Sequence, residues 1–208
     1  MSVRLSCAAL MIVATAIAGI GRATAQATSA NAPPALNITR DSAPGWLPTE
    51  RQRQDVINSA NDYFSALDQG RYDGAYAMMS DNNRRAVPLE RFIDESQKFR
   101  ARSGALKQRS ILKVTWTKGS AAAPLPGTYA AIDVASRYEN IDRHCGYVVL
   151  YQKSDCDSFR VMRQEGNFID NATAQNIEQK KSRAELDRLW ATLAANCPNY
   201  DTGSPKPQ

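Results

Sequence analysis

The stretch GYVVLYQKSDCDSFRVMRQEGNF, residues 146–168, decides the fold. Apolar residues dominate 146–152 and recur through 158–168, and between them lies KSDCDS, a run of turn-forming residues. This pattern predicts two strands joined by a short turn. Two further strands are predicted upstream, SILKVTWTKG (110–119) and TYAAIDVASRYEN (128–140), both with alternating apolar residues. Short links without helices predict an antiparallel meander of four strands.

Helical periodicity flanks this sheet on both sides. A first helix begins after Thr49, with Gln52 as its capping-box partner, and ends at Gly70. A second, short helix covers 72–79, and a third begins at Pro88 and ends near Gly104. An added helix covers 171–195. Helices followed by strands predict an α+β fold, with three N-terminal helices packed on a four-stranded antiparallel curved sheet.

The N-terminus has the order of a secretory signal peptide: Arg4, an uncharged run over 5–20, and small residues around Ala25. We therefore expect cleavage after Ala25, export to the periplasm or the extracellular space, and no membrane span in the mature chain. A flexible lead-in is expected over 26–48, a single domain over 49–197 and a tail over 198–208. Loss of the leader lowers the formal net charge from +5 to about +3, which together with export argues against nucleic acid as a partner.

The mature chain keeps three cysteines, Cys145, Cys156 and Cys197, in a compartment where disulfides persist. A regular hairpin places Cys145 and Cys156 at opposite ends of one arm, too far apart for a bridge. If a disulfide forms, Cys197 must therefore pair with one of the other two. Geometry alone leaves both pairings open, since a straight final helix favours Cys156 and a broken one could return to Cys145.

Two segments resemble a known group of proteins. YFSALDQGRYDGAYAMMS (63–80) resembles the opening helices of the nuclear transport factor two-like, cone-shaped superfamily. LPGTYAAIDVASRYEN (125–140) and residues 146–170 are similar to the later strands of an exported bacterial subgroup of undefined function. The resemblance implies a cone-like fold with a cavity between sheet and helices. The resemblance also implies a Cys-Gly pair at the start of the strand at 146–152 and a cysteine near the C-terminus. It therefore favours a disulfide between Cys145 and Cys197, with Cys156–Cys197 as the alternative.

The catalytic candidates are few. His144, the only histidine, precedes Cys145 directly, so the two side chains point to opposite faces of a strand and cannot form a catalytic or metal-binding pair. His144 is therefore interpreted as a surface residue at a strand entrance. A cone-fold isomerase or dehydratase would use a buried acid with a tyrosine, for which Asp133, Tyr76 and Tyr138 are the candidates. Because Ile132 and Val134 take the core face, Asp133 is expected to face solvent.

The sequence predicts no cofactor and no metal site, because it contains no second histidine and no C-x-x-C motif. The functional hypothesis is an exported, non-catalytic binding or assembly module of the cell envelope. Its partner would be an envelope protein or a small ligand. The sequence also allows the chain to form a homodimer. The alternative is a small cavity enzyme of the isomerase or dehydratase type that uses a buried carboxylate.

Overall fold

A computed structural model describes residues 36–40 and 42–194 of the chain. The predicted signal peptide, most of the predicted lead-in, Cys197 and the predicted tail lie outside these residues.

The predicted antiparallel meander is confirmed. Its strands are β2 (Leu106–Lys118), β3 (Thr128–Tyr138), β4 (Ile141–Gln152) and β5 (Arg160–Asp170), each paired antiparallel with the next. A short strand that the sequence does not predict, β1 (Leu36–Thr39), pairs in parallel with β2 at one edge. Strand β4 begins five positions before the predicted start at Gly146, because Ile141, Arg143 and His144 pair with the last residues of β5. This earlier start places His144 inside the sheet.

Four helices precede the meander, where three are predicted. They are α1 (Glu50–Asp68), α2 (Tyr72–Ala77), α3 (Asp81–Ala86) and α4 (Leu89–Ser103). The capping box of α1 is confirmed: Thr49 Oγ1 accepts from the Gln52 N–H, and Gln52 Oε1 accepts from the Thr49 N–H. The extra helix, α3, begins because the Ser80 hydroxyl accepts from the Asn83 N–H, an N-cap that the sequence reading missed.

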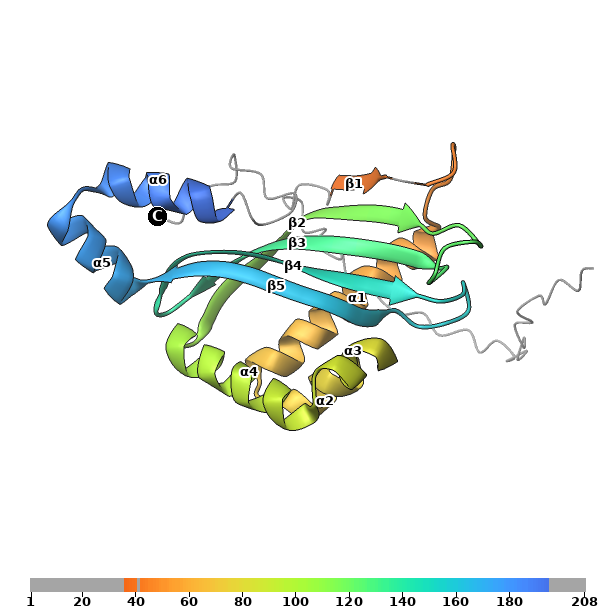
Figure 1. The fold of residues 1–208 in the computed structure, drawn as a ribbon, viewed down its shortest axis with the longest axis horizontal. Coiled ribbons are helices and arrows are strands. Elements are labelled where there is room, and N and C mark those ends of the chain that lie inside the picture. Colours follow the sequence, from red (N-terminus) through yellow and green to blue (C-terminus); the bar gives the residue numbers. More distant parts are fainter. Residues whose placement is uncertain (1–35, 41, 195–208) are drawn as a thin grey trace, which may run out of the picture. The chain divides into compact units, whose positions relative to one another are not determined.

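The main core lies between helices α1 and α2 and one face of the sheet (Figure 1). Alternate strand residues point into it, as the period-two pattern predicts. The buried residues come from α1 (Val56, Ala60, Tyr63, Phe64), from β2 and β3 (Val114, Trp116, Ala130, Ile132, Val134) and from β4 and β5 (Val148, Leu150, Val161). Helix α4 contributes less, since Phe92 and Phe99 are only half-buried and Leu89 is 37% exposed.

The predicted C-terminal helix is present but broken. Helix α5 (Asn171–Lys180) is followed by its C-cap, Lys181, and α6 (Arg183–Ala194) then folds back over the sheet (Figure 1). Ile169 of β5 packs with Ala174 and Leu186 in one cluster, while Cys145 packs with Ala194 and Trp190 in another. The break therefore brings the end of α6 to the face of β4 that points away from His144.

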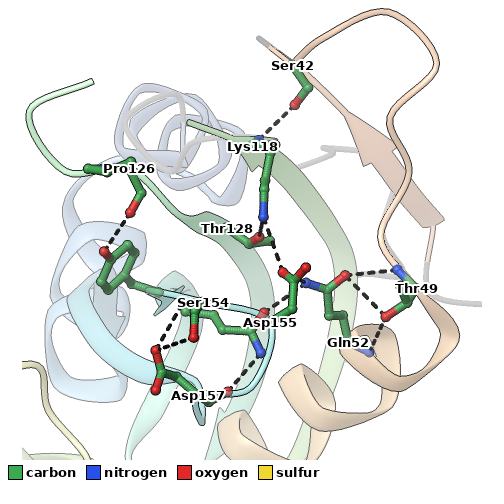
Figure 2. Close-up of polar contacts among 11 residues, drawn as sticks. Ser42, Thr49, Gln52, Lys118, Pro126, Thr128, Ser154, Asp155 and Asp157 are labelled. Atoms are coloured by element: carbon green, nitrogen blue, oxygen red, sulfur yellow. Dashed lines mark hydrogen bonds and ion pairs between the residues drawn. The ribbon is translucent and has the colours of Figure 1, made fainter. Parts of the chain in front are cut away.

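A polar network joins the start of α1 to the β4–β5 turn (Figure 2). It lies at the end of the sheet remote from α5 (Figure 1). Gln52 is buried and donates to Gln152 Oε1 at 2.8 Å and to Asp155 Oδ1 at 3.3 Å. Lys118 donates to Asp155 Oδ1 at 3.3 Å and to Thr128 Oγ1 at 2.9 Å. These contacts fix the position of α1 against the sheet.

A candidate ligand-binding cavity

A cavity of about 420 Å³ lies between the sheet and helices α1 and α4. Its walls come from α1 (Tyr63, Phe64, Asp68), α4 (Phe92, Ser96, Phe99), β2 and β3 (Arg109, Ser136, Tyr138), and β4 and β5 (His144, Gly146, Gln164, Gly166, Phe168). The apolar face of α4 borders this space instead of packing tightly on the strands. That arrangement explains why Phe92 and Phe99 stay half-buried. The volume is within the range of small-molecule sites.

Arg109 organises the polar end of the cavity. Its Nη1 and Nη2 donate to the two carboxylate oxygens of Asp68 at 2.6 and 3.2 Å. Nη2 also donates to the Tyr138 hydroxyl at 2.9 Å, and Nε donates to Ser136 Oγ at 3.1 Å. The guanidinium carbon lies 4.4 Å from the centre of the Phe64 ring. A guanidinium held by four hydrogen bonds and a ring is rigid, so Asp68, Ser136 and Tyr138 keep fixed positions.

Tyr63 and Gln164 form a second polar contact across the cavity. The buried Tyr63 hydroxyl donates to Gln164 Oε1 at 2.7 Å, which joins α1 to the edge strand β5. Burial raises the pKa of Tyr63, so its hydroxyl stays protonated. This tyrosine can donate a hydrogen bond but does not act as a base.

His144 also lines the cavity, so the prediction that it lies at the surface is wrong. Its Nδ1 is inaccessible to solvent and makes no hydrogen bond to any described residue. Burial lowers the pKa of His144 to about 4, and the positive charge of Arg109 contributes to this decrease. The imidazole is therefore neutral at physiological pH.

Two glycines make room for this ring. Gly146 and Gly166 are paired across β4 and β5. A Cβ on Gly146 would lie 2.9 Å from the Glu165 carbonyl oxygen and 3.2 Å from His144 Cε1. A Cβ on Gly166 would lie 3.3 Å from His144 Nε2. Glycine within a strand often marks a close approach, and here both a carbonyl oxygen of the paired strand and the imidazole approach each glycine.

Aromatic rings complete the wall around His144. Phe99 of α4 contacts Tyr138 and Phe168 edge-on, with ring centres 5.5 and 5.6 Å apart. The Tyr138 and His144 rings are also edge-on, at 5.6 Å. This end of the cavity thus combines apolar ring surface with a few fixed polar groups, which is typical of small-molecule sites.

The structure separates the three catalytic candidates. Tyr138 lies in the cavity. Tyr76 does not line it; its hydroxyl contacts the carbonyl oxygens of Arg84 and Val87 at 3.0 Å, which fixes the loop before α4. Asp133 lies on the opposite face of β3, since its neighbours Ile132 and Val134 point into the core. Asp133 and Tyr138 therefore do not converge.

Asp133 was expected to face solvent, and this expectation is wrong. Its relative exposure is 1%, and neither carboxylate oxygen has a hydrogen-bond partner among the described residues. Lys113 Nζ lies 3.8 Å from Oδ2. Burial raises the pKa of Asp133 to about 7, and the lysine opposes only part of that increase. Asp133 is therefore a desolvated carboxylate that lies outside the cavity.

Sequence reasoning missed Asp68, Arg109 and the role of His144. Asp68 reads as the last residue of an amphipathic helix, and Arg109 reads as part of a basic run that includes Lys107. Only the fold brings them together, across 41 positions of the chain. One signal was present in the sequence, because Gly146 and Gly166 interrupt two strands otherwise rich in β-forming residues.

The described residues define a class of protein: an α+β domain that encloses a cavity between helices and an antiparallel sheet. Residues 59–163 match the family described as "Protein of unknown function (DUF4019)", and the chain belongs to this family. The match includes Asp68, Arg109, Tyr138 and His144 of the cavity but ends before Gly166 and helices α5 and α6. No curated protein and no solved structure matches the chain.

The described part of the chain contains neither a candidate membrane-spanning helix nor a candidate metal site. None of its helices has the length and apolar character that crossing a membrane requires. No group of three or more His, Cys, Asp or Glu side chains within 36–40 and 42–194 is arranged to hold a metal ion.

Proposed function

We propose that this chain is an exported binding protein whose cavity holds a small, mainly apolar molecule. The observation that carries the proposal is the cavity of about 420 Å³, in which aromatic walls surround the fixed group of Arg109, Asp68 and Tyr138. Apolar walls supply binding energy through burial, and a few oriented polar groups supply specificity. The resemblance to the nuclear transport factor two-like superfamily supports the same proposal, because its cone-shaped members have a cavity in this position.

Binding is favoured over catalysis by the state of the ionisable groups. A general base works best with a pKa near the operating pH, whereas the pKa of His144 is about 4. Both oxygens of Asp68 already accept hydrogen bonds from Arg109. Asp133 has a suitable pKa, about 7, but lies outside the cavity. The other two acids that line the cavity, Glu95 and Glu165, are paired with Arg91 and Arg163. Among the described lining residues, no acid or base is therefore well placed to move a proton.

The alternative is a cavity enzyme of the isomerase or dehydratase type. One observation favours it: Arg109 joins an acid, Asp68, to a tyrosine, Tyr138, within one cavity. Such an enzyme would accelerate exchange of a proton next to a carbonyl in a bound ketone. Exchange at the same rate with wild-type protein and with Asp68→Asn would eliminate this alternative.

The proposal includes export, through the predicted signal peptide at 1–25, and a disulfide between Cys145 and Cys197. Support for this pairing comes from the end of α6, where Ala194 and Trp190 pack against Cys145 and the Leu193 carbonyl accepts from Asn167 Nδ2 at 3.2 Å. Cys197 follows Ala194 by three positions. Cys156 is exposed in the β4–β5 turn, at the other end of β4.

The experiment uses prodan, an uncharged naphthalene ketone whose fluorescence responds to polarity. We expect saturable binding at one site, with a blue shift of emission. Ser96→Phe should abolish it by filling the cavity, whereas Gln97→Phe, the next residue of α4 and exposed, should leave it unchanged. Equal binding to both variants, each with cooperative unfolding, would show that the probe binds elsewhere and refute the proposal.

A further inference from the structure

The starting observation is the unequal environment of the two His144 ring nitrogens. Nδ1 is closed off from solvent and without a hydrogen-bond partner in the described part of the chain. Nε2 lies above the Gly146–Gly166 pair, 3.3 Å from where a Cβ on Gly166 would be, and neither glycine has a side chain to separate the ring from the strands. Because His144 lines the cavity, Nε2 is the nitrogen that a bound molecule can reach.

A neutral imidazole has one N–H donor and one bare acceptor nitrogen. A proton on Nδ1 would be a buried donor with no acceptor, and such orphaned groups cost free energy and are rare. A proton on Nε2 can instead donate to a ligand. The geometry thus favours the tautomer with Nε2 protonated.

The other polar groups at this end of the cavity are also donors. The Tyr138 hydroxyl accepts from Arg109, so its own proton is directed to another partner. The acceptors are already used: both Asp68 oxygens accept from Arg109, and Gln164 Oε1 accepts from Tyr63. Among the described groups here, the Tyr138 hydroxyl and the His144 ring have no acceptor, so a ligand that brings an acceptor completes this arrangement.

The charges of the cavity wall favour an uncharged acceptor. Three acids and three arginines line it: Asp68, Glu95 and Glu165, with Arg100, Arg109 and Arg163. Arg109 is neutralised by Asp68, and Arg163 by Glu165. The third arginine, Arg100, is exposed and donates to the Asp68 carbonyl oxygen, so solvent screens its charge. A carboxylate beside His144 would lose its hydration without a buried, unpaired cation to replace it, which makes burying it costly. A carbonyl oxygen loses much less hydration.

We propose that His144 donates a hydrogen bond from Nε2 to the carbonyl oxygen of an uncharged ligand, an aromatic or alicyclic ketone, ester or amide. The Gly146–Gly166 pair holds the ring low enough for that ligand to fit above it. The inference rests on the proposed ligand-binding function and adds the chemical class of the ligand and the residue that recognises it.

The test compares three naphthalenes of similar shape as competitors of prodan: acetylnaphthalene, isopropylnaphthalene and naphthoate. Acetylnaphthalene should bind the wild-type protein roughly three- to tenfold more tightly than isopropylnaphthalene, the effect of one net hydrogen bond. In His144→Phe, which keeps a planar ring without a donor, the ratio of the two affinities should fall to about one. Naphthoate should be the weakest competitor.

Since His144 is the only histidine, its imidazole NMR signals need no assignment in untagged protein. Ring-nitrogen shifts should show the tautomer protonated on Nε2, and that signal should move when acetylnaphthalene binds but not when isopropylnaphthalene binds. This measurement needs no variant.

Three results would overturn the inference: the Nδ1-protonated tautomer, an unchanged affinity ratio in His144→Phe, or tightest binding of naphthoate with protonation of the ring. If prodan still binds and Ser96→Phe still blocks it, such results reject only the role of His144. If no naphthalene binds, both the inference and the proposed function fail.

Discussion

His144 and Cys145 are neighbours in the chain and lie on opposite faces of the sheet. His144 lines the cavity beneath α4, whereas Cys145 is fully buried against Trp190 and Ala194 of α6. Two successive residues of strand β4 therefore contact different layers of the fold, the cavity on one face of the sheet and helix α6 on the other. The histidine contributes to the cavity, and the cysteine contributes to holding the C-terminal helices.

The first prediction concerns Cys145. If it pairs with Cys197, replacement of either residue by alanine should lower the free energy of unfolding by ~2–4 kcal/mol, because the bridge restricts the unfolded chain. Urea denaturation of oxidised protein measures this loss. Ser158→Ala, exposed in the β4–β5 turn, is the control and should change stability much less. Peptide mapping without reductant should recover a Cys145–Cys197 peptide; recovery of Cys156 linked to Cys197 would contradict the pairing.

The sequence predicted the sheet well because period-two alternation is a local property. It predicted α1 and its capping box for the same reason, since Thr49 and Gln52 are three residues apart. The break between α5 and α6 and the position of β1 depend on tertiary contacts and were not predicted. The cavity was expected only from a family resemblance. Its polar end joins Asp68 to Arg109 and Ser136, which no local pattern relates.

His144 should make the protein less stable in acid. Its pKa falls from 6.5 to about 4 on folding, so between these values the unfolded chain binds more protons than the folded chain. The contribution of His144 is complete above about pH 6.5 and is lost as pH falls toward 4, by roughly 3 kcal/mol. Urea denaturation of wild type and His144→Phe across this range should show the loss only in the wild type. The NMR titration of the imidazole should give the same low pKa, and a midpoint near 6.5 would reject the argument.

Asp133 should have the opposite effect. Its pKa rises from 3.8 to about 7 on folding, so between these values the folded chain binds more protons. Stability should therefore fall as pH rises through this window, by a total of roughly 4 kcal/mol. Asp133→Asn removes the titration with little change of shape. The difference in unfolding free energy between this variant and wild type should grow as pH rises, which isolates Asp133 from the opposing effect of His144.

An exposed acid gives the control for this measurement. Asp62 lies on the solvent side of α1, so Asp62→Asn removes the same charge without removing a buried group. If Asp133→Asn and Asp62→Asn show the same pH profile, then the carboxylate of Asp133 is not strained in the folded protein.

Gln52 gives the last prediction, because one side chain both caps α1 and joins it to the β4–β5 turn. Gln52→Leu removes the donor to Gln152 Oε1 and leaves that buried oxygen unpaired, at a cost of ~1–3 kcal/mol. The loss of the capping acceptor for the Thr49 N–H should add about 1 kcal/mol. Gln54→Leu, on the exposed side of the same helix, should change stability by less than about 0.5 kcal/mol.

The double variant Gln52→Leu with Gln152→Leu separates the two effects. Since it leaves no orphaned amide of this pair in the core, it should lose less stability than the sum of the two single variants. The residual loss measures the cap, the contact from Gln52 to Asp155, and the contact from Gln152 Nε2 to the Asp157 carbonyl oxygen. Additive losses in urea denaturation would mean that the two glutamines act independently and that the 2.8 Å contact between them contributes nothing measurable.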